Sequence, residues 1–176
     1  MRTQVEKILH MAALEEGEYI FRRDPVDIHG IIRKAVKAVT LQVSERKGKI
    51  STSLDASQSI VQGDAVHIEN VIRNVLDNAE KYSPEFPELT VATTSVDSFL
   101  SIRISDRGIG MTKEQSARAF DKYYRVPTGN IHDVKGFGIG LSYVKLVVEG
   151  HGGTVAVHSE SGKGTTVEIR IPVKSA

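Results

Sequence analysis

Residues 64–83 show three polarity patterns at once when they are wound as a helix. Apolar residues recur at helical spacing and fall on one face, as in a helix that lies against a sheet. Charged residues form a second face, where opposite charges can pair in water, so we expect that face to be exposed to solvent. In order, the three faces consist of Ile68, Val71, Ile72, Val75, Leu76 and Ala79; of Glu69, Arg73, Asp77 and Glu80; and of Asn74, Asn78, Lys81 and Tyr82.

The third face of this helix favours a ligand site. An asparagine amide competes with the backbone for hydrogen bonds, so two of them inside a helix need a reason. Their oxygens can bind a hard cation such as Mg²⁺, a lysine ammonium can meet phosphate, and a tyrosine ring can cover an aromatic base. The alternative is that these residues are polar positions at the boundary of the core. The helix alone does not decide between the two interpretations.

Outside this helix, the pattern predicts short strands that alternate with helices. Apolar residues at helical spacing predict further helices, and period-two runs bounded by Gly, Pro or Asp predict strands, with a turn at Asp24-Pro25. We expect helices at 1–16, 26–46, 64–83, 112–125 and 141–149, strands at 19–23, 49–54, 59–63, 89–97, 98–106, 154–160 and 164–173, and a loop that can act as a lid at 126–135.

The order of these elements indicates the fold class. Most strands follow one another across short turns, so we expect each strand to pair with its neighbour in the chain, with helices between the pairs. The expected class is α+β, a two-layer α/β sandwich in which three main helices cover one face of a mixed, mostly antiparallel sheet. At 176 residues, the chain suits one domain.

Composition limits the partners and the compartment. Lys plus Arg total 23 against 22 for Asp plus Glu, so the net charge of +1 offers no field for nucleic acid or an anionic membrane. The absence of cysteine excludes disulfides, a thiolate nucleophile and a cysteine zinc site. No apolar run reaches the roughly 18 residues that span a bilayer, and no signal peptide precedes the first helix. We therefore expect the chain as given to be soluble.

Two glycine-rich motifs suit a nucleotide. DRGIGM begins where a strand ends, so Asp106 can accept a hydrogen bond from an exocyclic amine, and the missing Cβ atoms of Gly108 and Gly110 allow a flat ligand to approach. GFGIGLS opens a helix whose free N–H groups can face phosphate. It is not the dinucleotide motif, because Leu141 stands where the third glycine belongs, and it is not a Walker loop, because no Gly-Lys-Ser/Thr follows.

Taken in chain order, five motifs resemble the catalytic, ATP-binding domain of bacterial sensor histidine kinases. The resemblance covers about residues 18–174 and extends to the superfamily of gyrase, the heat-shock chaperone ATPase and the mismatch-repair ATPases. It implies a Bergerat-type fold that binds ATP and Mg²⁺. The motifs are NVIRNVLDNAEKYS, similar to the family's N box; DRGIGM, its first glycine box; FDKYYR, its F box; GFGIGLS, its second glycine box; and GKGTT.

The resemblance also implies roles for individual residues. Asn78 is expected to bind Mg²⁺ with Asn74 beside it, and Asp106 to bind the adenine amino group. Arg107 stands where the family commonly has asparagine, and is expected to point to solvent. The implied catalytic residues are Asn74, Lys81 and Arg125. Tyr82 and Thr165 are expected at adenine, Gly108 and Gly110 at the pocket wall, Lys81, Arg125 and Lys135 at the phosphates, and Gly136, Gly138 and Gly140, followed by Leu141, around the phosphate chain.

The family phosphorylates a histidine within the pattern His-Glu/Asp-x-Arg/Lys-Thr/Asn-Pro. His132, in HDVKGF, comes nearest, but it lacks the Thr-Pro and lies in the predicted lid. We interpret His29 and His67 as helix-surface or boundary residues. The acceptor is therefore expected on a separate helical hairpin, whose tail is residues 1–17, while residues 18–176 form the ATP-binding domain. The remaining histidines, which carry no functional argument, are His10, His151 and His158.

The resemblance further implies a parent protein and its partners. The parent is expected to be an inner-membrane, homodimeric sensor with a cytoplasmic catalytic domain, which works with the acceptor hairpin and a response regulator. This fragment would be a monomer or weak dimer that binds no nucleic acid. One alternative is an ATP-hydrolysing relative, but such enzymes carry a glutamate as general base where this chain has Asn74. The other is a nucleotide-sensing or docking module without catalysis.

Overall fold

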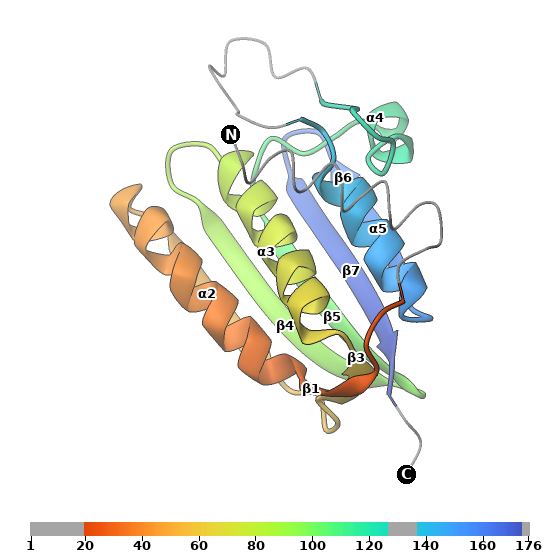
Figure 1. The fold of residues 1–176 in the computed structure, drawn as a ribbon. Coiled ribbons are helices and arrows are strands. Elements are labelled where there is room, and N and C mark those ends of the chain that lie inside the picture. Colours follow the sequence, from red (N-terminus) through yellow and green to blue (C-terminus); the bar gives the residue numbers. More distant parts are fainter. Residues whose placement is uncertain (1–19, 127–136, 174–176) are drawn as a thin grey trace.

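The structure is a computed structural model that describes residues 20–126 and 137–173. Its elements are β1 Asp24–Asp27, α2 Ile28–Glu45, β2 Lys49–Leu54, β3 Ile60–Gly63, α3 Ala65–Lys81, β4 Glu88–Val96, β5 Phe99–Asp106, α4 Lys113–Ala117, α5 Gly140–Gly150, β6 Thr154–Glu160 and β7 Gly164–Pro172. Helices α2, α3 and α5 lie side by side over one face of a five-stranded sheet (Figure 1). The predicted two-layer α+β sandwich is therefore confirmed.

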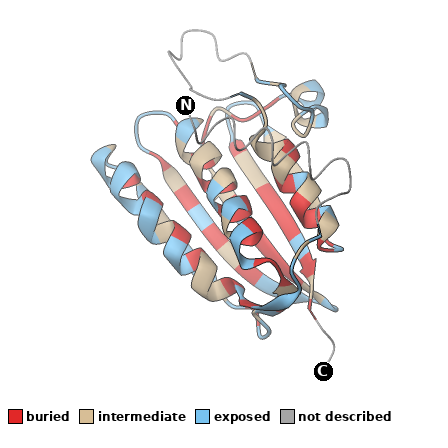
Figure 2. Cartoon of the chain, in the orientation of Figure 1, coloured by how far each residue is buried: buried red, intermediate tan, exposed pale blue. Residues whose placement is uncertain are grey.

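Helix α3 lies at the centre of the core, as its apolar pattern predicted. Every apolar position of its first face is buried toward the sheet and the flanking helices (Figure 2). The helix begins after Asp64, whose carboxylate accepts hydrogen bonds from the N–H groups of Val66 (3.1 Å) and His67 (3.3 Å) as an N-cap. It ends at Lys81, with Tyr82 as the C-cap. The caps set where α3 begins and ends, and burial of its apolar face sets the direction of its asparagine face.

The strand order β2-β4-β5-β7-β6 corrects the prediction that each strand pairs with its neighbour. β2 pairs in parallel with β4, and β3 pairs with β1 in a separate two-stranded ribbon. A parallel pair needs a crossover connection, and α3 provides it. The predicted β4–β5 and β6–β7 hairpins are present, and β5 pairs with β7 so that Asp106 lies opposite Thr165. This register brings two predicted site residues together where two inner strands, β5 and β7, meet at one end of the sheet.

The strand predicted at 19–23 is absent from its described part, and the expected turn at Asp24 is instead the start of β1. Phe21 lies on the last turn of α5, where a Cβ added to Gly150 would come within 2.2 Å of the ring. Its ring also lies 5.2 Å from the ring of His67 and 4.7 Å from that of His151, centroid to centroid, and such aromatic contacts are stabilising. Residues 20–23, just before β1, therefore pack against α5 without regular secondary structure.

The charged face of α3 is not the solvent face that the spacing suggested. Glu69 pairs with Lys34 of α2 at 2.8 Å, and Glu80 pairs with Arg46 just after α2. Both glutamates are half-buried, whereas Arg73 is exposed as expected. The cations of the neighbouring helix therefore replace the pairs that α3 was expected to form with itself.

The helix predicted at 112–125 is limited to α4. A capping box between Thr112 and Gln115 begins it, but none of its residues is buried, so little packing stabilises a longer helix. The following residues form turns, and Tyr123 adopts a φ of 61°, outside the helical region.

Within the described residues, no helix combines the length and the apolar character needed to cross a bilayer. The helix predicted at 1–16 lies outside the described residues, as does the predicted lid except for Val126.

Candidate nucleotide-binding site

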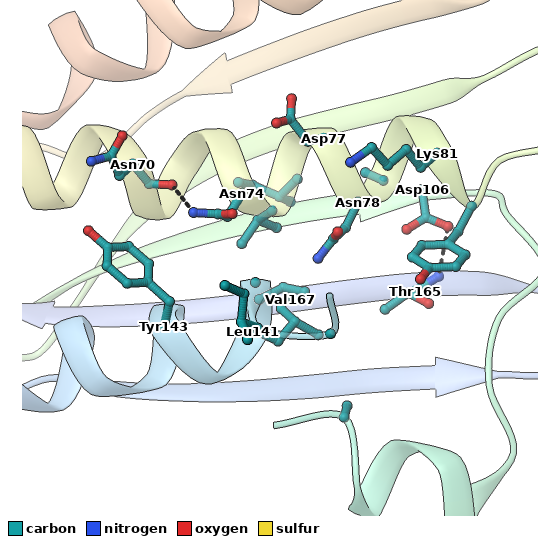
Figure 3. A pocket seen from close by; sticks show the side chains of 18 of the residues that line it. Asn70, Asn74, Asp77, Asn78, Lys81, Asp106, Leu141, Tyr143, Thr165 and Val167 are labelled. Carbon is teal, nitrogen blue, oxygen red and sulfur yellow. Dashed lines mark hydrogen bonds between the residues drawn. The ribbon is translucent and has the colours of Figure 1, made fainter. Parts of the chain in front are cut away.

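A cavity of about 560 Å³ lies between α3 and α5, against residues of β5 and β7, and its volume is typical of small-ligand sites (Figure 3). It has a sheet end, defined by Tyr82, Asp106, Gly110 and Thr165, and a helix end, defined by Asn74, Asn78, Gly138 and Gly140. Of the predicted site residues, the cavity is lined by Asn74, Asn78, Lys81, Tyr82, Asp106, Gly110, Arg125, Gly138, Gly140, Leu141 and Thr165.

At the sheet end, one carboxylate is held by backbone N–H groups. Asp106 Oδ1 accepts hydrogen bonds from the N–H of Gly108 (2.7 Å) and of Thr165 (3.2 Å). Burial raises the pKa of Asp106 to about 6, although both of these hydrogen bonds favour the charged form and lower it. Asp106 Oδ2 has no partner among the described residues. This oxygen is available to accept a hydrogen bond from a ligand amine.

The glycines of DRGIGM allow backbone segments to meet behind the sheet end. A Cβ on Gly108 would lie 2.4 Å from the carbonyl oxygen of Tyr82, and Gly108 does not itself line the cavity. Gly110 has a φ of 62°, and a Cβ there would lie 1.9 Å from the carbonyl oxygen of Glu160. Glycine is therefore required at Gly110 by both backbone conformation and space.

At the helix end, asparagine side chains of α3 face the start of α5 (Figure 3). Asn74 donates from Nδ2 to the carbonyl oxygen of Asn70 at 2.8 Å, which fixes its amide. A Cβ added to Gly140 would stand 3.6 Å from Asn74 Oδ1 and 3.7 Å from Asn78 Nδ2. The start of α5 is thus close to both amides, and its free N–H groups suit an anion.

The residues of the helix end also suit a hard cation held together with phosphate. The half-buried side chain of Asn78 makes no hydrogen bond within the described residues, so its amide oxygen is available as a ligand. The residues that the structure describes contain no group of three His, Cys, Asp or Glu that could hold a metal by itself. A site of this kind suits Mg²⁺, which often binds through one or two protein ligands plus substrate phosphates.

Two predicted cations lie at the mouth of the cavity. Lys81 and Arg125 are exposed and line it. Arg107 is exposed, as expected, and pairs with Glu88 at 3.0 Å. Lys135 and Gly136, the remaining predicted residues, lie outside the described residues.

Sequence reasoning missed the far wall of the cavity. His67, expected at a helix surface or boundary, is 5% exposed and lines the cavity, where its Nδ1 lies 2.8 Å from the hydroxyl of Tyr143. His151 is also buried; its Nε2 accepts a hydrogen bond from the N–H of Asp64 at 3.0 Å, and burial lowers its pKa. No local signal predicts these contacts, because the partners are 76 and 87 positions apart.

The fold is a two-layer α/β sandwich, and its cavity suits a nucleotide. Residues 63–175 match the family described as "Histidine kinase-, DNA gyrase B-, and HSP90-like ATPase", and the chain belongs to this family. The resemblance inferred from the five motifs is confirmed.

Named relatives agree with this assignment. Sensor protein RprX of Bacteroides fragilis (strain YCH46) is 40% identical over 98% of this chain and 34% of its own length. The structure of the mycobacterial sensor histidine kinase MprB matches 88% of this chain and 99% of that chain, with 27% identity and a TM-score of 0.73. Full-length ShkA in complex with AMPPNP has the same fold, with a TM-score of 0.87 at 23% identity over 99% of this chain and 36% of that chain. The chain therefore spans about a third of the length of RprX.

Proposed function

We propose that this chain is the catalytic domain of a sensor histidine kinase, which binds Mg·ATP and transfers the γ-phosphate to a histidine on a separate helical hairpin. The observation that carries the proposal is the division of one cavity into a carboxylate-bearing sheet end and an amide-bearing helix end. The first suits an adenine amine and the second suits phosphates with a cation. The AMPPNP bound in ShkA, a protein of the same fold, is consistent with this ligand.

Each part of the site has a role in this proposal. Asp106 accepts a hydrogen bond from the adenine amino group and orients the base, with Tyr82 and Thr165 beside it. Asn78, with Asn74, would hold Mg²⁺, which supplies positive charge against the phosphates. Lys81 and Arg125, together with Lys135, Gly136, Gly138, Gly140 and Leu141, contact the phosphate chain. Positioning and charge stabilisation are the main contributions a protein makes to phosphoryl transfer.

Asn74 favours transfer over hydrolysis. A hydrolase needs a general base for water, and such a base typically contributes about 10²- to 10⁴-fold. The Asn74 amide cannot accept a proton, and its Nδ2 is already bonded to the Asn70 carbonyl. Water attack is therefore expected to be slow in this site.

The rest of the parent protein follows from the same proposal. Residues 1–17 would be the tail of the dimerising hairpin that carries the acceptor, and residues 18–176 the catalytic domain. The parent would be a membrane-anchored homodimer with this domain in the cytoplasm, and a response regulator would receive the phosphoryl group. This fragment by itself would be a monomer or weak dimer.

The test uses γ-labelled ATP and Mg²⁺ with the chain alone, and with an added hairpin fragment that bears the acceptor histidine. The chain alone is expected to bind ATP, to remain unlabelled and to release little phosphate. Acid-labile label is expected on the hairpin fragment, inefficiently because no tether raises its effective concentration.

Other outcomes would contradict specific parts of the proposal. Label on the chain itself at His132 would make that residue an acceptor. Steady phosphate release that Asn74→Ala abolishes would favour the hydrolase. Nucleotide binding without transfer to any hairpin would favour the sensing or docking module.

A further inference from the structure

An arginine outside the cavity holds the turn that follows α3. Arg46, at the C-terminal end of α2, donates from Nη1 to the carbonyl oxygen of Glu80 (2.9 Å) and from Nη2 to those of Ser83 (2.8 Å) and Pro84 (2.7 Å). Its Nη1 also pairs with the carboxylate of Glu80. With side chains only 35% and 16% exposed, this ion pair is partly shielded from water. One guanidinium therefore ties together three carbonyls and a carboxylate.

The turn held by Arg46 leads directly to the sheet end of the cavity. Tyr82 lies between the bonded carbonyls, and its own carbonyl oxygen accepts a hydrogen bond from the N–H of Ile109 at 3.0 Å. Both residues line the cavity. The neighbouring Gly108 lies against the same Tyr82 carbonyl and donates its N–H to Asp106. A displaced turn would therefore move the loop that orients Asp106.

We propose that Arg46 is a positioning residue for adenine recognition, a role that rests on the proposed nucleotide function. It acts through the turn and Ile109 and does not touch the ligand. A guanidinium has a planar fork of donors that can reach several carbonyls at once, whereas a lysine ammonium is a point charge. A cation at the C-terminus of α3 also interacts favourably with the helix dipole.

The substitutions Arg46→Lys and Glu80→Gln test this role, with Arg33→Lys as the matched control. Arg33 lies on the same helix, is exposed, and makes only a loose ion pair with Asp27 at 3.7 Å within the described residues. Arg46→Lys keeps the charge but loses the fork. Glu80→Gln keeps the contacts of Arg46 with the carbonyls and weakens the ion pair.

Three quantities are measured for each variant: affinity for Mg·ATP, affinity for Mg·GTP by competition, and exchange of the Ile109 amide hydrogen. Arg46→Lys is expected to weaken ATP binding about three- to tenfold, as for one hydrogen bond made in poor geometry. GTP binding is expected to change less, so the ATP-to-GTP preference falls, and exchange at Ile109 is expected to accelerate. Glu80→Gln is expected to change the same three quantities by smaller amounts. Arg33→Lys is expected to change none of them.

A purely structural role gives a different pattern. A lower melting temperature for Arg46→Lys, with unchanged base preference and unchanged protection of Ile109 relative to neighbouring amides, would overturn the inference. If Arg46→Lys does not fold, an unchanged preference in Glu80→Gln overturns it. Failure of the unaltered chain to bind ATP at all would instead overturn the proposed function on which the inference rests.

Discussion

The two ends of the cavity are built in opposite ways. At the sheet end, backbone N–H groups hold the polar wall in place: Asp106 Oδ1 accepts two backbone hydrogen bonds, and the Tyr82 carbonyl accepts one from Ile109, so that Asp106 Oδ2 is left for a ligand. At the helix end, the Asn78 amide has no partner within the described residues. The start of α5 near it has N–H groups that a helix cannot satisfy internally.

This difference separates recognition of the base from recognition of the phosphates. A flat base gains from a rigid wall that already has the right shape, because little entropy is lost on binding. Charged phosphates and a cation interact strongly with polar groups of the protein. Such groups can therefore lack a protein partner until the ligand binds. Substitutions at the sheet end should therefore affect the fold as well as binding of the base, whereas those at the helix end should mainly affect binding of the phosphates and the cation.

Substitution of two glycines, one at each end of the cavity, is expected to give the largest difference between the two ends. Gly110→Ala is expected to lower the free energy of unfolding by about 2–5 kcal/mol, since positive φ and overpacking both cost energy. Gly140→Ala should change stability by less than about 1 kcal/mol, because its Cβ would meet Asn74 and Asn78 only at ordinary contact distance. Its methyl group would nevertheless crowd the phosphates and weaken ATP binding. Urea unfolding and calorimetric titration measure the two effects, and equal destabilisation by both changes would contradict the comparison.

Asn78→Ala should cause the largest loss of ligand binding without a loss of fold. Removal of a metal ligand is expected to weaken Mg·ATP binding by at least about 10- to 100-fold. A loss of that size is already typical when a residue that only supports a metal ligand is changed. Without Mg²⁺ the loss should be small. Asn70→Ala is the control, because Asn70 contacts Asn74 through its backbone carbonyl. Equal losses with and without Mg²⁺ would exclude Asn78 as a metal ligand.

Acidification should act on the sheet end through Asp106. Its pKa is about 6, and in the charged form Oδ2 can accept from the adenine amine while Oδ1 keeps its two backbone hydrogen bonds, so affinity should be constant above neutral pH and fall below it. Between pH 7 and pH 5 the loss is expected to be about tenfold. Adenosine is the ligand for this titration because it carries no phosphate that titrates. Asp106→Asn should bind more weakly at pH 7 and lose the pH dependence; an unchanged profile would exclude Asp106 as its source.

The same pKa affects stability in the opposite sense. The folded chain binds this proton more tightly than the unfolded chain, whose pKa is near the ordinary 3.8. The contribution of Asp106 to the free energy of unfolding is therefore greatest at low pH and declines as pH rises from about 4 through about 6. Urea unfolding of the unaltered chain and Asp106→Asn across this range isolates the contribution.

The smallest effect is expected at Thr165. Its N–H bonds Asp106, whereas its hydroxyl lies 2.9 Å from the hydroxyl of Ser159. Thr165→Val keeps the first contact and removes the second, so adenosine affinity should fall by less than about threefold. Ser159→Ala removes the same contact from the other side, together with the bond from Ser159 to the Gly164 carbonyl oxygen at 2.9 Å, and sets an upper limit for the loss of this contact. A much larger loss for Thr165→Val alone would show that its hydroxyl meets the base directly.

The sequence by itself determined the elements whose signals are local. The apolar face of α3, the cap at Asp64 and the turn at Asp97-Ser98 all depend on residues close together in the chain. The motifs also identified most of the residues that line the cavity, because ligand chemistry restricts residue type at fixed spacings. Whether those residues perform the proposed roles stays a prediction.

The tertiary structure alone decided which distant segments meet. The parallel pairing of β2 with β4, the position of Phe21 on Gly150, and the hold of Arg46 on the turn after α3 have no local signal. The last contact joins residues 37 positions apart. Such contacts depend on how three helices pack on one face of the sheet. This packing, and not the spacing of residues in the chain, determines which side chains come into contact. The same physical reason placed Glu69 and Glu80, on the charged face of α3, against Lys34 and Arg46 instead of in solvent.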